Sequence, residues 1–135
     1  MESNAALAER LMTVFGKDMD FWWANADEAL TLEFPFAPSI GMPERVSGMA
    51  ESRAYLETVV TQLAGLTFRD LVVTPTADPD MVMLEYKGSC PAPNGQYNQK
   101  YITVMRFRNG KLSLFREYWD TAEVTRAFGN LGEAF

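Results

Sequence analysis

The chain has 135 residues, of which 47% are apolar and 13% aromatic, so we expect residues 1–135 to form one domain with a substantial core. Its net charge of −6 argues against nucleic acid or an anionic membrane as the main partner, and no apolar stretch is long enough to span a membrane. The absence of histidine excludes imidazole acid–base chemistry and most zinc sites, which leaves carboxylates, tyrosines, arginines or ordered water for any chemistry.

The first half of the chain is mostly helical by pattern. Apolar residues at helical spacing predict a first helix over Ala5–Phe15. A short second helix is predicted over Met19–Ala24, with Asp18 as its N-cap. The alternating run Leu30–Phe34 then predicts a strand.

A loop and a third helix complete this half. Prolines and a glycine predict a loop over Ala37–Val46, and Ser47 is a candidate N-cap for the helix that follows. The buried face of this helix would hold its apolar residues Leu56, Val59, Val60 and Leu63.

The second half of the chain is rich in strands. Asn109-Gly110 predicts a tight hairpin, Pro91–Gly95 predicts another turn, and Asp120 with Glu123 matches a capping box that opens a last helix ending at Gly129. Four strands are predicted from β-branched, aromatic or alternating residues: Leu66–Thr74, Met81–Ser89, Tyr97–Arg108 and Lys111–Trp119. Helices followed by strands indicate an α+β fold, in which helices cover one face of a mostly antiparallel, strongly twisted sheet that encloses a pocket.

Four segments, in this order and spacing, resemble the SnoaL-like branch of the nuclear transport factor 2-like superfamily: Leu32–Phe36, Arg45–Gly48, Phe107–Lys111 and Arg116–Asp120. That superfamily includes ketosteroid isomerase, limonene epoxide hydrolase, SnoaL-type polyketide cyclases and the phenazine-biosynthesis A/B proteins. The resemblance spans nearly the whole chain and implies a cone-shaped α+β barrel with a pocket. It implies no single reaction, because this scaffold carries unrelated activities.

Departures from the family's known sites narrow the chemistry. The general-base aspartate of ketosteroid isomerase falls on Phe34, its second aspartate falls near Thr103, and its first-helix tyrosine has no counterpart in Ala5–Phe15. Steroid isomerisation by that mechanism is therefore not expected, and the histidine-dependent SnoaL-type site cannot form. Among these families, the resemblance of the site is greatest to the phenazine A/B proteins, since the inward carboxylate of their last strand would match Glu117.

The same resemblance fixes which side chains face the pocket, because successive residues of a strand point to opposite faces. Inward residues would be Leu32, Phe34, Leu84, Tyr86, Gln99, Tyr101, Thr103, Met105, Phe115, Glu117 and Trp119. Outward residues would include Glu33, Val104, Arg106, Leu114, Arg116 and Tyr118, and Val104, Leu114 and Tyr118 would support a homodimer through the outer sheet face.

Glu117 is the main catalytic candidate. Between Phe115 and Trp119 on an apolar wall, its carboxyl would be desolvated, and the raised pKa would let it exchange a proton near neutral pH. The alternative is that Glu117 forms a salt bridge or lies on the surface of the sheet. Tyr86 and Tyr101 are the other catalytic candidates, as hydrogen-bond donors to a ligand oxygen, although core packing is the commoner role for such tyrosines.

Seven further residues are expected to bind the ligand: Trp22, Phe34, Leu84, Thr103, Met105, Phe115 and Trp119. Asp18 and Asp120 are better explained as helix caps, and Arg45 or Arg53 could hold a ligand carboxylate only as a minority interpretation. No sequence motif for a metal, nucleotide or other cofactor is present, so no cofactor is expected. The single cysteine, Cys90, lacks a basic setting for a thiolate and suits a reducing cytoplasm.

The sequence therefore predicts a cofactor-independent enzyme that acts on a small hydrophobic molecule by proton transfer, as an isomerase, cyclase or dehydratase would. A non-catalytic binding or carrier module with the same pocket is the alternative. An interaction domain, dimeric through its sheet, is compatible with both.

Overall fold

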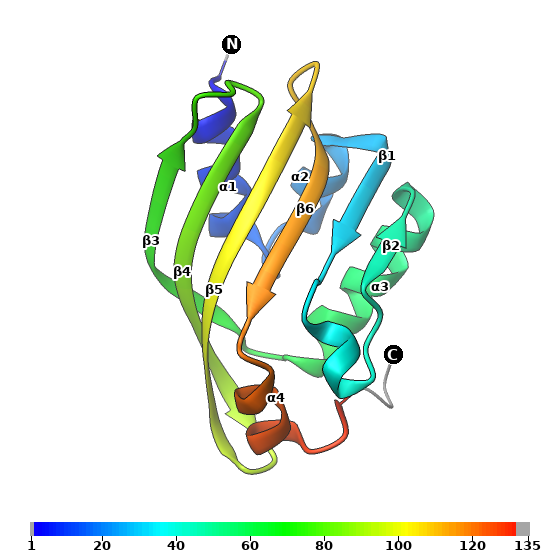
Figure 1. Cartoon of the computed structure of the whole chain (residues 1–135), viewed down its shortest axis with the longest axis vertical. Helices are drawn as coiled ribbons and strands as arrows, with labels where there is room; N and C mark the ends of the chain where they lie inside the picture. The colour runs from blue at the N-terminus through cyan, green and yellow to red at the C-terminus, as the bar shows by residue number, and fades with distance from the viewer. Residues whose placement is uncertain (1, 132–135) are drawn as a thin grey trace.

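The computed structural model describes residues 2–131, which form a curved six-stranded sheet with helices behind it (Figure 1). The helical elements are α1 (Asn4–Val14), α2 (Met19–Ala24), the 3-10 turn η1 (Ala37–Ile40), α3 (Met49–Gln62) and α4 (Thr121–Phe128). The strands are β1 (Ala26–Glu33), β2 (Arg45–Ser47), β3 (Thr67–Pro75), β4 (Met81–Ala92), β5 (Gly95–Arg108) and β6 (Lys111–Trp119).

The strands are ordered β2-β1-β6-β5-β4-β3 across the sheet. All neighbours run antiparallel except β1 and β6, which are parallel. Helices α1, α2 and α3 cover one face, and α4 lies at the end of β6, as Figure 1 shows. The predicted α+β class and the mostly antiparallel curved sheet are confirmed. No helix within residues 2–131 is long and apolar enough to cross a membrane.

Trp22 fixes the short helix α2 to the rest of the core. Its indole is fully buried and donates through Nε1 to the carbonyl of Leu11 on α1 at 2.7 Å. Its ring also meets Phe15 and Phe115 edge-on, at centroid distances of 5.4 Å each. Trp22 therefore connects helices α1 and α2 to β6. These packing contacts are sufficient to explain why it is buried.

Gly88 of β4 leaves room for two aromatic rings, those of Tyr101 and Phe68, to pack against the strand. A Cβ at this position would lie 2.9 Å from Cε2 of Tyr101 and 3.1 Å from Cδ1 of Phe68, closer than side chains pack. The space left by its missing side chain is filled by these rings. Any larger residue at this position would have to displace these rings.

The predicted boundaries fail where the chain turns between elements. The expected loop Ala37–Val46 contains η1 and the start of β2, because Val46 and Ser47 pair with β1. Ser47 is consequently a strand residue, and the N-cap of α3 is Gly48, which has a φ of +92°. The short edge strand carries too few residues for its alternation to be read from sequence.

Two further details differ from the expectation. The turn between β4 and β5 is confined to residues 93–94, so both strands extend into the stretch expected to turn. Asp120 does cap α4, accepting from the Ala122 N–H at 2.9 Å. The capping box is incomplete, because Glu123 accepts from the Asn98 N–H and pairs with Arg126 instead.

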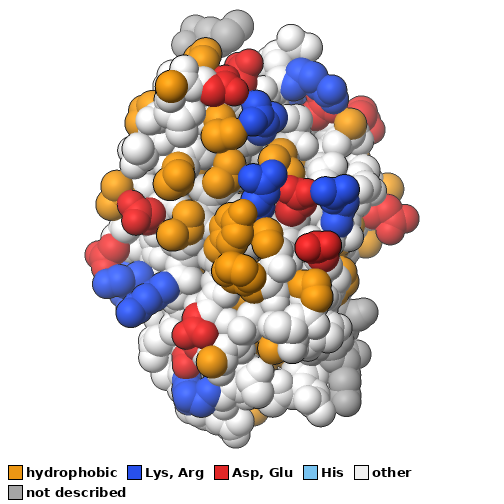
Figure 2. Space-filling view, viewed as in Figure 1, with side chains coloured by type: hydrophobic (Ala, Val, Ile, Leu, Met, Phe, Trp, Pro, Cys, Tyr) orange, Lys and Arg blue, Asp and Glu red, His pale blue; other side chains and the backbone are white. Residues whose placement is uncertain are grey.

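The outer face of the sheet mixes apolar and charged side chains. Figure 2 shows an apolar patch near its centre, bordered by blue and red side chains. Val72, Met83 and Ile102 are exposed apolar residues of strands β3, β4 and β5. Phe36 is exposed as well, and its ring meets Tyr118 of β6 edge-on at 5.5 Å. This face of the structure is therefore neither fully polar nor covered by a helix.

Candidate functional site

A small cavity lies between the inner face of the sheet and the helices. Its volume is about 60 Å³. Its lining is formed by Met12, Phe15, Phe34, Met42, Tyr55, Leu56, Val59, Leu63, Leu66, Phe68, Tyr97, Tyr101, Phe115, Glu117, Trp119, Val124 and Leu131. Among residues 2–131, Glu117 is the one charged residue in this lining.

Glu117 reaches the cavity from the middle of β6. It stands opposite Thr103 of β5 in the antiparallel register. Burial is the largest influence on its carboxyl and raises its pKa to about 7, from an ordinary 4.5, while hydrogen bonds from Tyr86 and Trp119 act in the lowering direction. At neutral pH both the protonated and the ionised form are therefore populated, as an acid–base group requires.

Tyr86 connects Glu117 to the interior of the sheet. Its hydroxyl donates to Oε2 of Glu117 at 2.8 Å and lies 2.6 Å from Oγ1 of Thr103. A phenol has one hydrogen, so while Tyr86 donates to the carboxylate, Thr103 must donate to Tyr86. Burial, and then the charge of Glu117, raises the pKa of Tyr86 well above its usual range, so it remains a donor at neutral pH.

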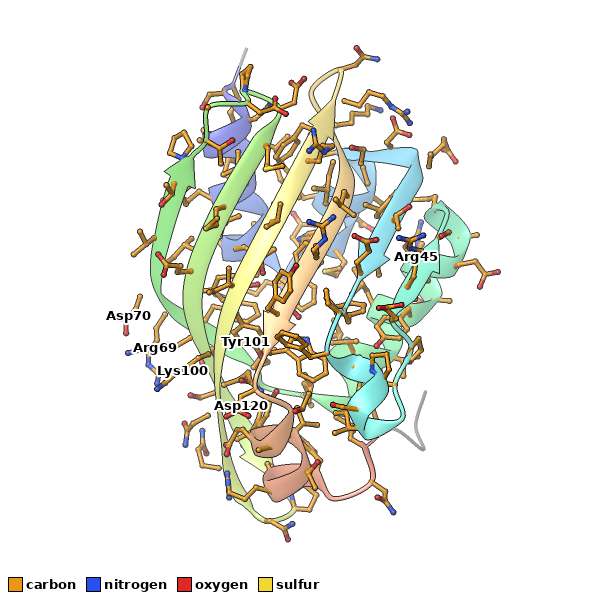
Figure 3. All side chains as sticks on the ribbon, in the orientation of Figure 1. Arg45, Arg69, Asp70, Lys100, Tyr101 and Asp120 are labelled. Carbon is orange, nitrogen blue, oxygen red and sulfur yellow. The ribbon has the colours of Figure 1, made fainter. Side chains whose placement is uncertain are left out.

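Tyr101 stacks on Tyr86 and leads to a second polar group. The two rings are 4.8 Å apart and 18° from parallel. Beyond them, Gln99 donates through Nε2 to the Tyr97 hydroxyl at 2.8 Å and to the carbonyl of Asp120 at 2.8 Å. Figure 3 shows Tyr101 on β5 and Asp120 at the start of α4. This second group of side chains lies at the α4 end of the cavity.

The structure brings together half of the residues predicted for the site. Phe34, Tyr101, Phe115, Glu117 and Trp119 all line the cavity. The other predicted residues are buried but lie outside the lining: Trp22, Leu84, Tyr86, Thr103 and Met105. Tyr86 and Thr103 act on Glu117 through hydrogen bonds, whereas ligand contact by Trp22, Leu84 and Met105 stays a prediction.

The residues considered as alternatives have other partners. Arg45, at the β2 edge of the sheet (Figure 3), pairs with Glu33, and Arg53 pairs with Glu57 and lies over the Trp23 ring. Asp18 caps α2 through the Phe21 N–H. These contacts explain each residue without a ligand. Burial raises the pKa of Cys90, which agrees with the expectation that it is no nucleophile.

Sequence reasoning overlooked Tyr97, Tyr55 and Phe68. Tyr97 has the same inward parity as Tyr101, and continuing the alternation of β5 by two steps would have found it. Tyr55 comes from α3, opposite the sheet, where its ring stacks on Phe34 at 5.3 Å. Helical contacts of this kind depend on how α3 docks, which a single sequence does not fix. Within residues 2–131 no cluster of three or more cysteine and acidic residues could hold a metal ion.

Comparison with known proteins places this geometry in context. The model of the SnoaL-like domain matches residues 6–115. The chain is 34% identical to the uncharacterized protein YesE of Bacillus subtilis over 115 residues, which is 84% of this chain and 78% of the relative. It is 33% identical over 136 residues to an uncharacterized PhzA/B-like protein of Pseudomonas aeruginosa, covering 99% of this chain and 95% of the relative.

Solved structures share the same architecture. A Bacillus subtilis protein named as a proposed isomerase superposes with a TM-score of 0.80 at 32% identity, covering 92% of this chain and 91% of that one. A phenazine biosynthesis-related protein of Pseudomonas aeruginosa gives 0.83 at 17% identity, covering 94% and 81%. A Pseudomonas putida protein named as a proposed polyketide cyclase gives 0.77 at 19% identity, covering 94% and 98%.

Proposed function

The chain belongs to the SnoaL-like family, and we propose that it is a cofactor-independent enzyme that moves a proton on a small hydrophobic molecule, with Glu117 as the acid–base group. The observation that carries this proposal is a single carboxyl, with a pKa of about 7, in a cavity wall to which the described residues contribute no other charge. The family and its isomerase-type and cyclase-type neighbours are compatible with this chemistry.

The proposed reaction needs no net change at Glu117. The ionised carboxylate takes a proton from a carbon of the bound molecule and returns it to another carbon, or to a leaving oxygen, in the next step. Isomerisation, cyclisation and dehydration all fit this cycle, since the protein regains its starting state each time. Apolar walls favour this exchange because they exclude water, which would otherwise stabilise the carboxylate and lower its basicity.

Tyr86 would serve Glu117 in both halves of the cycle. It donates to Oε2 when the carboxylate is ionised, and its hydroxyl can turn toward Thr103 when Glu117 carries the proton. Neither group needs to enter the cavity for this role. We therefore assign Tyr86 and Thr103 as positioning residues and keep Glu117 as the residue that touches the reacting molecule.

Proton transfer can be tested without knowing the natural substrate. The protein is incubated in D₂O with a panel of small cyclic ketones, and deuterium entry next to the carbonyl is followed by NMR. Glu117→Gln should slow exchange by about 10²–10⁴-fold, the usual contribution of general acid–base catalysis. Glu33→Gln, which changes a carboxyl on the outer face of the same sheet, is the matched control and should leave exchange unchanged. Equal rates in wild type and Glu117→Gln would remove this role.

A non-catalytic binding or carrier module is the second candidate. The cavity's apolar and aromatic lining suits retention of a hydrophobic ligand without any reaction. The same panel distinguishes the two: ketones that raise the melting temperature of the wild-type protein but gain no deuterium would favour the carrier.

We further propose that the protein is a homodimer joined through the outer sheet face. The exposed side chains of Val72, Met83 and Ile102 on this face support the proposal, since exposed apolar patches often mark interfaces. Ile102→Lys should weaken association at least tenfold in sedimentation measurements, and a wild-type protein that is monomeric at micromolar concentration would contradict the dimer. A cytoplasmic location remains a prediction from cysteine content.

A further inference from the structure

The Gln99 amide is held in one orientation by four hydrogen bonds. Its Oε1 accepts from two backbone N–H groups, those of Lys100 at 2.9 Å and Asp120 at 2.8 Å. Because both of these partners can only donate, that atom must be the oxygen. The nitrogen Nε2 must then donate its two hydrogens, one to the Asp120 carbonyl and the other to the Tyr97 hydroxyl, each at 2.8 Å.

The Tyr97 hydroxyl is therefore an acceptor toward Gln99. Burial is the largest influence on both Tyr97 and its neighbour Tyr101 and raises the pKa of each phenol, so both keep their hydrogens at neutral pH. Because Gln99 is the donor in its bond to Tyr97, that bond leaves the hydroxyl hydrogen of Tyr97 available to another acceptor.

The hydrogen that Tyr97 retains can point into the cavity. The Tyr97 side chain is 3% exposed and lines the same cavity as Glu117. In its 2.8 Å hydrogen bond with Gln99 the Tyr97 hydroxyl is the acceptor, so this bond does not use its hydrogen. Two other tyrosines are unsuited to this role, because Tyr86 donates to Glu117 and Tyr118 lies on the outer face near Phe36.

We propose that Tyr97 donates this hydrogen to an oxygen of the bound molecule, so that the ligand is a small hydrophobic compound with a carbonyl or comparable acceptor. The proposal rests on the proposed function for its catalytic meaning: a carbonyl held by Tyr97 would acidify the neighbouring C–H that faces Glu117. When that proton moves to Glu117, the electron pair of the C–H bond passes to the carbonyl oxygen as an enolate, which Tyr97 stabilises.

The binding part of the proposal is tested with two probes of nearly the same shape, cyclohexanone and methylenecyclohexane. Only the ketone can accept a hydrogen bond. Affinities are measured by NMR titration at pH 9, where Glu117 is ionised and cannot donate. The wild-type protein should prefer the ketone, and Tyr97→Phe should weaken ketone binding about three- to tenfold with the hydrocarbon unchanged. Tyr118→Phe is the matched control and should retain the wild-type preference.

The result is decisive in both directions. A wild-type protein with no preference for the ketone, or a Tyr97→Phe variant that keeps it, would overturn the proposal. If Tyr97→Phe does not fold, wild-type protein with ¹³Cζ-labelled tyrosine replaces it. The Tyr97 signal, assigned through its contacts with Gln99, should shift with the ketone and stay still with the hydrocarbon, and an unmoved signal overturns the proposal.

These measurements do not depend on turnover. The proposed function fails if Glu117→Gln exchanges deuterium at the wild-type rate, whereas the role of Tyr97 fails on binding alone. The two outcomes are therefore separable.

Discussion

Two glutamates on adjacent strands of one sheet have opposite chemistry. Glu33, on β1, faces outward and receives hydrogen bonds from Arg45 and Arg116. Burial alone would raise its pKa, but the two guanidinium groups outweigh burial and lower it. Glu117, on β6, faces inward, no arginine or lysine of residues 2–131 pairs with it, and burial raises its pKa to about 7.

The contrast arises from a single step along a strand. Arg116 points outward and pairs with Glu33, while its neighbour Glu117 points into the cavity. Alternation thus places the compensating arginines on the outer face, and the part of the chain that the structure describes supplies none to the carboxyl on the inner face. What distinguishes a structural carboxylate from a candidate catalytic one here is the side of the sheet on which it lies.

The largest expected effect is on the free energy of unfolding, when an apolar side chain is truncated on the inner or on the outer face of the sheet. Phe115→Ala, in the cavity wall, should lower the free energy of unfolding by about 3–5 kcal/mol, because a fully buried aromatic ring is removed. Ile102→Ala, at an exposed position of the outer face, should cost about 0.5 kcal/mol or less in the monomer. Urea denaturation of both variants measures the difference, and similar losses would contradict the assignment of the core to the inner face.

The next effect is the pH dependence of stability. Because the pKa of Glu117 is raised in the folded state, the folded protein keeps a proton on Glu117 that the unfolded chain releases near pH 4.5. Stability should therefore fall as pH rises from about 4.5 to 7 and then level off. For a shift of about 2.5 pKa units, at about 1.4 kcal/mol per unit, the total loss is about 3–4 kcal/mol.

Glu117→Gln should remove this dependence of stability on pH. Parallel curves of unfolding free energy for wild type and variant between pH 4 and 8 would contradict the prediction.

Glu33 should affect stability at acidic pH instead. Its pKa is lowered in the folded state, so its ion pairs stabilise above the unfolded pKa and this contribution is lost as pH falls through the folded pKa. Glu33→Gln should accordingly flatten only the acidic limb.

A smaller effect is expected when the donor to Glu117 is removed. Tyr86→Phe deletes the hydroxyl that stabilises the ionised carboxylate, so the pKa of Glu117 should rise by about one unit. Carboxyl ¹³C chemical shifts across a pH titration measure this change directly. Tyr118→Phe, on the outer face, is the control, and an unchanged pKa in Tyr86→Phe would exclude the coupling.

The smallest effect concerns the outer ion pairs. Arg45 is largely exposed, and Arg116 still pairs with Glu33 after Arg45→Ala. The variant should therefore lose only about 0.3–1 kcal/mol of unfolding free energy, less at high salt. A loss above about 2 kcal/mol in denaturant titration would show that the outer carboxylate depends on this one arginine.

Long periodic segments were predictable from sequence, and short ones were not. The alternation of β5 and β6 correctly placed Thr103 and Phe115 on the buried face. Strand β2 was missed because three residues carry no readable period, and its place at the sheet edge depends on pairing with β1. The cap of α3 was misplaced by one residue, since Gly48 starts the helix by adopting a positive φ rather than through a side chain.

Half of the site could be predicted for the same reason. Glu117 followed from strand alternation once the family resemblance had fixed which side chains face inward, and its desolvation was inferred from its neighbours Phe115 and Trp119. Which tyrosine serves the ligand could not be inferred, because that depends on hydrogen bonds between residues distant in sequence. The bond from Gln99 to the Asp120 carbonyl, which fixes the amide beside Tyr97, links β5 to the start of α4 across 21 residues.

The parallel pairing of β1 with β6 imposes an order on how the molecule is made. Glu33 and Arg116, which face each other across these strands, are 83 residues apart in the chain. During synthesis β1 must wait for almost all later segments before its partner emerges, so the wall that carries Glu117 is assembled last. A chain that stops before Lys111 would present β1 and β5 as open edges, inviting association with other nascent chains.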